Sequence, residues 1–320
     1  MINLLDEDYQ ARALRADVRA GLTAAPGARW LPPKWFYDAR GSELFEEITR
    51  LPEYYPTRTE RAVLTTAAPE IARTTDAKTL VELGSGSSEK TRLLLDAMLS
   101  RGTLGAFVPL DVSESALTAA VGALTEAYPG LTVTGVIGDF ARHLGHLPDG
   151  DNRVVAFLGG TIGNLVPAER AAFLTALRQT LHPGEWLLLG ADLVKDPGIL
   201  VPAYDDAAGV TAEFNRNVLH VVNRELGADF DPLAFTHVAT WNPGREWIEM
   251  RLRASGEQRV RITALDLTVT FAAGEELRTE VSAKFRRDGL SAELSAAGFA
   301  LSHWWTDPRQ WFGVALAQAR

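Results

Sequence analysis

The chain has 320 residues, of which 46% are hydrophobic and 23% charged, enough to bury one large core or two smaller ones. Its 32 Lys and Arg against 41 Asp and Glu give a formal net charge of −9, and no basic cluster interleaved with aromatic residues is visible, which disfavours a nucleic-acid partner. The absence of cysteine excludes disulfides, thiol nucleophiles and cysteine-ligated metals.

The start of the chain, MINLLDEDYQARAL, has acidic residues where a signal peptide has a basic region. No segment reaches the ~20 apolar residues of a membrane span. We therefore expect a cytoplasmic protein with no membrane partner. Among the six histidines, only His143 and His146 have an HxxH spacing, and they fall in an expected loop, so the sequence predicts no metal.

Residues 1–60 combine a polar helical stretch with two aromatic segments. The first, Trp35–Asp38, follows a Pro-Pro turn, and the second, Tyr54-Tyr55-Pro56, follows a short helix that Pro52 ends. These segments present tyrosines, and we assign them to the substrate side of the protein.

From about residue 60 to 196 the hydrophobic pattern alternates between strand and helix. Such alternation predicts an α/β fold with an open, doubly wound and mostly parallel sheet. The expected strands are 79–83, 106–110, 131–137, 153–159 and 185–191. The expected helices are 60–74, 88–100, 113–127 and 167–181.

The segment KTLVELGSGSSEK, residues 78–90, joins the first of these strands to a helix through a glycine turn. Gly84 and Gly86 allow positive φ and close approach of the backbone to a ligand, and Ser87 or Ser88 can cap the helix. The third glycine of a dinucleotide fingerprint is replaced by Glu89, which would repel a pyrophosphate, and no P-loop motif occurs. An acidic loop suits the positive sulfonium of S-adenosylmethionine (SAM), which predicts a SAM-dependent methyltransferase of the doubly wound class.

Two later strand ends carry further candidates for cofactor binding. Asp111 lies 25 residues beyond Gly86, where folds of this class place an acid on the ribose hydroxyls. Asp139 and Phe140 follow the next strand, where the carboxylate can accept from the adenine amino group and the ring can cover the base. Taken singly, each acid is better explained as a strand-end cap or a solvated loop residue, but the order and register of the two together favour the functional interpretation.

The loop after the fourth strand, FLGGTIGNL, is rich in glycine and ends in Asn164. A loop at the carboxyl end of a central strand faces the crevice where ligands bind. The amide of Asn164 can bind an amine or a carboxylate, although an Asn that only serves the turn is an equal alternative.

After Asp196 the alternation ends. One or two helices are expected over 199–226, with Tyr204 among them, followed by strand-like runs at 235–241, 246–254, 258–262 and 266–271. A helix at 291–297 and strands at 300–306 and 311–318 complete the sheet. The adjacent Asp205 and Asp206 would face apart on a helix, which favours solvation over general-base chemistry. We infer a discontinuous arrangement, with a SAM-binding core from 60–196 and 286–320 and a substrate domain from 1–59 and 197–285.

Over nearly its full length the chain resembles the histidine-specific Nα-methyltransferases of ergothioneine biosynthesis. The shared strings are LPPKWFYDARGSELFEEITRLPEYYPTRTE, VELGSGSSEKT, VPLDVSE, GDF, FLGGTIGNL, LLGADLVKD, AAGVTAEFNRNVL and EVSAKF. The resemblance implies that L-histidine and its mono- and dimethyl forms are the substrates, that hercynine is the product, and that SAM is converted to S-adenosyl-L-homocysteine. We expect a monomer with a small-molecule substrate.

The resemblance also implies roles for residues of this chain. The amino-acid site would comprise Tyr37, Tyr54, Asn164, Tyr204, Met250, Glu280 and Ser282. Glu280 and Ser282 would grip the imidazole, since residues i and i+2 of a strand share a face. Because a free α-amino group is mostly protonated at neutral pH, we assign acceptance of its proton to Tyr37 with water, so Tyr37 and Asn164 are the catalytic candidates. The cofactor site would comprise Gly84, Gly86, Lys90, Asp111, Asp139 and Phe140.

Each assignment has an ordinary structural alternative: Tyr54 can pack a turn, Tyr204 can lie on a helix surface, and Met250 can belong to a core. Three other functions also stay open. The chain could methylate another small amino acid or amine, it could bind SAM without catalysis, or it could be an NAD(P) oxidoreductase, which Glu89 disfavours.

Overall fold

The computed structural model describes residues 1–5, 8–86 and 88–320, and the chain divides into two compact units built from separate stretches. The first unit comprises Met1–Asp6, Pro56–Val194 and Lys284–Arg320. The second comprises Glu7–Tyr55 and Lys195–Ala283.

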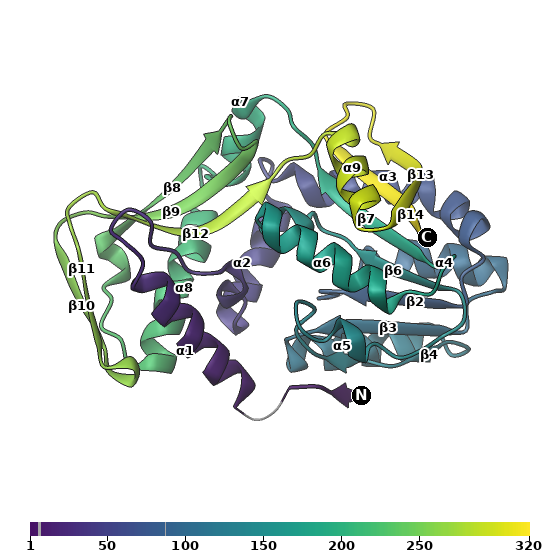
Figure 1. Cartoon of the computed structure of the whole chain (residues 1–320), viewed down its shortest axis with the longest axis horizontal. Helices are drawn as coiled ribbons and strands as arrows, with labels where there is room; N and C mark the ends of the chain where they lie inside the picture. The colour runs from purple at the N-terminus through teal and green to yellow at the C-terminus, as the bar shows by residue number, and fades with distance from the viewer. Residues whose placement is uncertain (6–7, 87) are drawn as a thin grey trace. The chain divides into compact units, whose positions relative to one another are not determined.

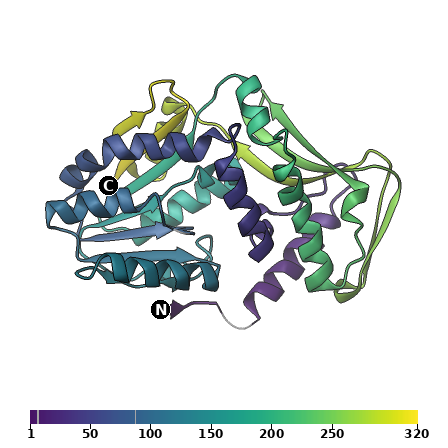
Figure 2. The same ribbon diagram turned by 180° about the vertical axis from the view of Figure 1, so that it is seen from behind.

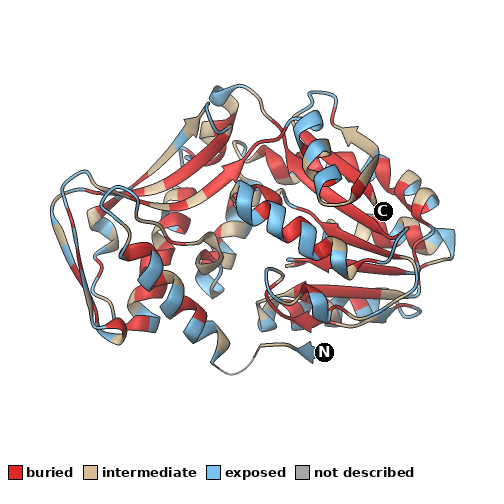
Figure 3. Ribbon diagram, viewed as in Figure 1, coloured by how far each residue is buried: buried red, intermediate tan, exposed pale blue. Residues whose placement is uncertain are grey.

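The first unit is built on a nine-stranded, mostly parallel sheet (Figure 1). In order across the sheet its strands are β1 (Ile2–Asn3), β5 (Val136–Ile137), β3 (Ala106–Asp111), β2 (Thr79–Leu83), β6 (Arg153–Phe157), β7 (Trp186–Asp192), β14 (Phe312–Ala319) and β13 (Phe299–Thr306), and β4 (Thr132–Val133) pairs with β3 beside β5. Among the described strands of this sheet, β14 runs antiparallel to both its neighbours, β7 and β13, and the other pairs are parallel. The central strands β2, β6 and β7 are buried along their whole length, as parallel strands covered on both faces are (Figure 3).

Helices cover both faces of this sheet. They are α3 (Tyr55–Thr75), α4 (Arg92–Arg101), α5 (Glu114–Ala127), α6 (Pro167–Thr180) and α9 (Arg287–Ala296). Figures 1 and 2, which view the molecule from opposite sides, show α6 on one side of the sheet and α3 with α4 on the other. One core cluster joins apolar residues of α3 and α4, such as Leu64 and Met98, to Leu80 of β2 and Leu188 of β7. The chain thus forms the predicted doubly wound α/β fold.

The strand order reverses beside β2. Successive strands are added on one side of β2 as far as β5, and then β6 and β7 are added on the other side. In open α/β sheets, ligands bind outside the carboxyl ends of strands at such a reversal. The turn after β2 and the loop after β6 therefore occupy the expected binding edge.

The predicted single strand at 131–137 is wrong, because β4 and β5 are separate two-residue strands. Gly135 lies between them, and a Cβ at this residue would collide with the sulfur of Met1. The start of the chain packs there, since Ile2 donates its N–H to Gly135 O at 2.8 Å and β1 pairs with β5. These first residues thus lie in the first unit, whereas the sequence placed them with the substrate domain.

The second unit combines helices with an antiparallel three-stranded sheet in the order β12 (Glu276–Ala283), β9 (Trp247–Ala254) and β8 (Phe235–Asn242). A separate hairpin joins β10 (Gln258–Ile262) to β11 (Leu267–Phe271). The helices are α1 (Tyr9–Leu22), α2 (Ala39–Arg50), α7 (Pro197–Leu200) and α8 (Val210–Leu226). Helix α8 lies beside α2 and contacts the sheet (Figure 2). Nine of its residues are buried.

The segment between α7 and α8 places Asp205 at the surface, as expected, but corrects the expectation that Asp206 is solvated. Asp206 is buried, and its carboxylate accepts hydrogen bonds from the N–H groups of Val210 (3.0 Å) and Thr211 (2.7 Å) at the start of α8. These hydrogen bonds lower the pKa of Asp206, although burial opposes them. Asp206 therefore satisfies the otherwise unpaired donors of the helix N-terminus.

Candidate active site

The glycine turn after β2 has the backbone conformation that its sequence predicts. Gly84 and Gly86 have φ values of +67° and +50°, which residues with a Cβ rarely adopt. The N–H groups of Gly84 and Ser85 donate to the carbonyl of Leu110 at 2.8 and 3.1 Å, so the turn is tied to the end of β3. A Cβ at Gly86 would meet nothing within 4 Å, which leaves room for a ligand beside the backbone.

Asp111, at the end of β3, lies against this turn. Its Oδ2 accepts from Gly86 N–H and its Oδ1 from Ser113 N–H, both at 2.9 Å. A carboxylate has about four acceptor positions, so both oxygens can still accept from a diol. The structure thus brings Gly86 and Asp111 together, as the sequence predicted.

Glu82 is the second-to-last residue of β2, and its side chain anchors the segment that follows the glycine turn. Its carboxylate accepts from the hydroxyls of Ser88, at 3.0 Å, and Thr91. Burial raises the pKa of Glu82 to about 7, although both hydrogen bonds oppose the shift. The prediction that Ser88 caps the next helix is therefore wrong, because α4 begins at Arg92 and the Ser88 hydroxyl points to Glu82. Ser87, the alternative cap, lies outside the described residues.

Lys90 pairs with Glu60 of α3, which sequence reasoning did not single out. Glu60 is fully buried, and its Oε1 also accepts from Gly159 N–H at 2.8 Å. One carboxylate therefore connects the segment after β2 with the loop after β6. Gly190 could have pointed to this contact from the sequence, because glycine inside a buried strand often marks the close approach of another group. In the structure that group is Glu60, since a Cβ at Gly190 would collide with its Oε1.

Asp139 and Phe140 follow β5, and each contacts neighbouring residues. Asp139 is buried, and its Oδ1 accepts from Ala141 N–H at 2.8 Å. The Phe140 ring packs edge-on against Phe157 and Phe173, with centroids 5.1 and 5.9 Å apart. A Cβ at Gly84 would lie 4.0 Å from Phe140 Cε1, so this ring stands beside the glycine turn.

Asn164 ends a short 3₁₀ turn, Thr161–Asn164, that follows β6. Gly159 and Gly160 enter the turn with φ of +79° and +71°, and Gly163 N–H donates to Gly160 O at 2.9 Å. The turn that contains Asn164 therefore lies at the same edge of the sheet as the glycine turn after β2, because β6 and β2 are parallel neighbours.

Three tyrosines of the second unit, together with Phe45, form one continuous aromatic row. Centroid distances are 5.5 Å from Tyr37 to Phe45, 6.1 Å from Phe45 to Tyr54 and 6.4 Å from Tyr54 to Tyr204. The row ends where the Tyr204 hydroxyl lies 2.8 Å from the Ser282 hydroxyl. Tyr204 is buried, so its alternative as a surface tyrosine is wrong.

Met250 and Glu280 are direct partners in the β9–β12 ladder. Residues directly opposite in an antiparallel pair point to the same side. Ser282, opposite Ile248, lies two places along β12 from Glu280 on that same side. Thus Met250, Glu280 and Ser282 share one face, together with the end of the aromatic row.

Among residues 1–5, 8–86 and 88–320, no group of three or more His, Asp or Glu side chains is arranged to hold a metal ion. No helix in the described part of the chain combines the length and apolarity needed to cross a membrane.

The reversed strand order, the glycine turn after β2 and the acid after β3 define a class I SAM-dependent methyltransferase. The model of the family described as "Histidine-specific methyltransferase, SAM-dependent" matches residues 14–319, and the chain belongs to this family.

Named relatives agree with this assignment. The chain is 61% identical over 317 residues to the histidine N-alpha-methyltransferase of Mycolicibacterium smegmatis, covering 99% of this chain and 98% of the relative. It is 58% identical over 315 residues to the protein of the same name from Mycobacterium tuberculosis, covering 98% of each. It is also 28% identical to ergothioneine biosynthesis protein 1 of Neurospora crassa, covering 96% of this chain and 35% of that protein.

Proposed function

We propose that this methyltransferase transfers three methyl groups in succession to the α-amino group of L-histidine, which yields hercynine, the first intermediate of ergothioneine biosynthesis. The observation that carries the proposal is the shared face of Glu280, Ser282 and Met250 beside Tyr204. This face combines a carboxylate, two hydroxyls and an apolar side chain, which suits an imidazole with two polar nitrogens and apolar carbons.

In the proposed amino-acid site, Glu280 and Ser282 bind the two ring nitrogens and Met250 packs against the ring. Tyr204 and Asn164 hold the α-carboxylate and the amine, and Tyr54 borders the site next to Tyr204. The names of the two mycobacterial relatives, which are histidine N-alpha-methyltransferases, support histidine as the acceptor.

In the proposed cofactor site, Gly84 and Gly86 let the backbone approach SAM, and Asp111 accepts from the ribose hydroxyls. Asp139 accepts from the adenine amino group while Phe140 covers the base. Lys90 borders the site, and its charge is balanced by Glu60. SAM supplies an electrophilic methyl group on a positive sulfur and leaves as S-adenosyl-L-homocysteine.

The protein's part in the reaction is mainly orientation. The amine lone pair forms the new N–C bond as the S–C bond breaks, and holding the reactants in line can lower the barrier by ~7 to 11 kcal/mol. The amine must first lose a proton, and Tyr37 with a water molecule is the proposed acceptor; Tyr37 lies at the opposite end of the aromatic row from Tyr204 and is 41% exposed, so water can reach it. The rings of Tyr37 and Phe45 can stabilise the growing ammonium by ~0.5 to 2 kcal/mol.

Mass spectrometry of L-histidine incubated with the enzyme and SAM tests the proposal. We expect products that carry one, two and three added methyl groups. The proposal is wrong if histidine gains none, and gain on a different amine in the same assay would identify the enzyme as an N-methyltransferase of another acceptor.

A further inference from the structure

Strand β12 contains a β-bulge at Thr279 that decides which face Glu280 and Ser282 occupy. Before the bulge, Glu276 and Arg278 lie opposite Arg253 and Arg251; after it, Glu280 lies opposite Met250. In a regular strand, residues 276, 278, 280 and 282 would all share one face, because side chains alternate with a period of two. The extra residue moves Glu280 and Ser282 to the other face.

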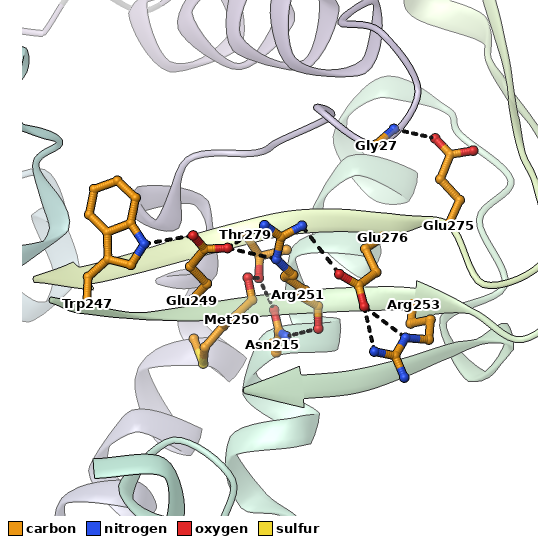
Figure 4. Close-up of polar contacts among 10 residues, drawn as sticks. All are labelled: Gly27, Asn215, Trp247, Glu249, Met250, Arg251, Arg253, Glu275, Glu276 and Thr279. Carbon is orange, nitrogen blue, oxygen red and sulfur yellow. Dashed lines mark hydrogen bonds and ion pairs between the residues drawn. The ribbon is translucent and has the colours of Figure 1, made fainter. Parts of the chain in front are cut away.

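The two faces of this sheet differ in chemistry. On one face, charged side chains form a chain of ion pairs in which Arg251 contacts Glu249 and Glu276, and Arg253 contacts Glu276 (Figure 4). A regular register would place Glu280 opposite Glu249, within that charged row and away from Met250. The bulge is therefore necessary for Glu280 to face the proposed imidazole site.

The bulge is held by a buried asparagine of α8. The Thr279 hydroxyl donates to Asn215 Oδ1 at 2.6 Å and also lies 3.1 Å from the carbonyl of Met250 (Figure 4). Asn215 is fully buried, and its Nδ2 donates to the carbonyl of Arg251 at 3.1 Å. Asn215 thus connects the bulged residue of β12 to the neighbouring strand β9.

The same amide reaches Tyr204 through His237. Asn215 Nδ2 donates to His237 Nδ1 at 2.8 Å, and His237 Nε2 donates to the carbonyl of Tyr204 at 2.8 Å. The Tyr204 hydroxyl in turn contacts Ser282, which brings the connection back to β12. Four hydrogen bonds therefore connect five buried residues, Thr279, Asn215, His237, Tyr204 and Ser282, in a chain whose two ends both lie on β12.

We propose that Asn215 and Thr279 are positioning residues for acceptor specificity: they lock the β12 bulge, and the bulge presents Glu280 and Ser282 to the side chain of the amino acid. This inference rests on the proposed function, because it concerns the site assigned there to the imidazole. Removing the lock lets β12 move toward the regular register, in which Glu280 faces the charged row.

The test is steady-state kinetics of Thr279→Val, which keeps the side-chain shape and removes the hydroxyl, with histidine and with an amino acid that lacks an imidazole. We expect the KM for histidine to rise roughly tenfold, because a tenfold change corresponds to the loss of about one buried hydrogen bond. The KM for SAM should stay unchanged. The preference for histidine over the other amino acid should fall by a similar factor. Thr279→Ser, which restores the hydroxyl, should recover both values.

Three comparisons make the result decisive. Thr268→Val, at an exposed position of β11, is the matched control and should leave every value unchanged. Asn215→Leu should repeat the effect of Thr279→Val, and it decides the question if Thr279→Val does not fold. Deleting Thr279 in the Asn215→Leu background should restore the preference for histidine, because a strand one residue shorter keeps Glu280 opposite Met250 without a bulge.

The inference is overturned if Thr279→Val or Asn215→Leu folds and keeps both the KM and the preference of the wild type. It is also overturned if the KM for histidine and the KM for SAM rise together, which would indicate a general structural role. A wild-type enzyme that does not methylate histidine would instead contradict the proposed function, so the two failures are distinguishable.

Discussion

Gly190 of β7 packs so tightly against Glu60 of α3 that a methyl group at residue 190 would overlap Oε1 of the carboxylate. Glu60 cannot easily move away, because it is fully buried and binds both Lys90 and the N–H of Gly159. The helix, the strand and the two loops at the binding edge therefore depend on one another at this point.

Gly190→Ala should destabilise the protein by about 1–3 kcal/mol, because the added methyl group overpacks a buried strand beside a fixed charge. Urea denaturation gives the free energy of unfolding. The control is Gly122→Ala on the exposed side of α5, where a Cβ meets nothing within 4 Å and a gain of about 0.5–1 kcal/mol is expected. Equal stability of Gly190→Ala and the wild type would refute the close packing.

Glu82→Gln should change how stability depends on pH. The pKa of Glu82 is raised from 4.5 to about 7 in the folded state, so the folded state binds the proton more tightly and the wild type loses stability as pH rises from 4.5 through about 7. The contribution is on the order of 3 kcal/mol. Glutamine has no such titration, so the stability difference between variant and wild type should move in favour of the variant over this range. Urea denaturation at pH 5 and pH 8 measures it, with Glu126→Gln on the exposed face of α5 as the control.

Tyr204→Phe and Ser282→Ala should each raise the KM for histidine about tenfold, because both remove the same 2.8 Å hydrogen bond. The double variant should be worse than either single variant but better than the product of the two effects, because the shared hydrogen bond can be lost only once while each hydroxyl also makes its own proposed contact with histidine. Kinetics of the four proteins form a double-mutant cycle, and fully multiplicative effects would show that the two hydroxyls act separately. Tyr128→Phe, whose hydroxyl binds Asp96 on α4, is the matched control and should leave the KM unchanged.

Asn217→Leu should lower kcat about tenfold with a smaller effect on the KM for histidine. Asn217 Nδ2 donates to the carbonyl of Phe36 at 3.0 Å and to Asp38 Oδ1 at 2.8 Å, so it fixes the residues on either side of Tyr37, the proposed proton acceptor. Asn223→Leu on the same helix, which removes two hydrogen bonds to Phe230, should reduce stability but not kcat. If the two variants lose kcat equally, Asn217 has no particular connection to Tyr37.

Asp111→Ala should raise the KM for SAM at least tenfold, because it removes the proposed ribose acceptor and also frees the N–H groups of Gly86 and Ser113. Equilibrium dialysis with SAM measures the affinity directly. Asp151→Ala, which removes an exposed carboxylate paired with Lys78, should bind SAM like the wild type. An unchanged affinity of Asp111→Ala would remove this residue from the cofactor site.

The elements of the parallel sheet were predictable because local signals agree there. The strand Thr79–Leu83 has the expected bounds, and its glycine turn has the expected positive φ values. The two-residue strand Ile2–Asn3 was not predictable, since both residues are exposed and the strand exists only by pairing with β5. Asp206 was misjudged because its role depends on where the chain leaves one helix and enters the next, a boundary that hydrophobic periodicity does not locate.

At the candidate site, too, some side-chain contacts were predictable from the sequence and others were not. Asp111 and Gly86 meet because parallel strands end at a common edge, which sequence spacing alone indicates. Glu60 escaped notice because its partners, Lys90 and Gly159, are 30 and 99 residues away along the chain. The bulge at Thr279 was invisible for a different reason, since an extra residue in a strand is recognised only against the register of its partner.

The division of the chain after residues 6, 55, 194 and 283 has a consequence for synthesis on the ribosome. All residues of the second unit have been translated by residue 283, whereas the first unit still lacks β13 and β14, which complete one side of its sheet. Until those last strands emerge, the outer edge of β7 has no partner, and an unpaired edge is a site for aggregation. A chain truncated before β14 should therefore accumulate in inclusion bodies even though its glycine turn is intact.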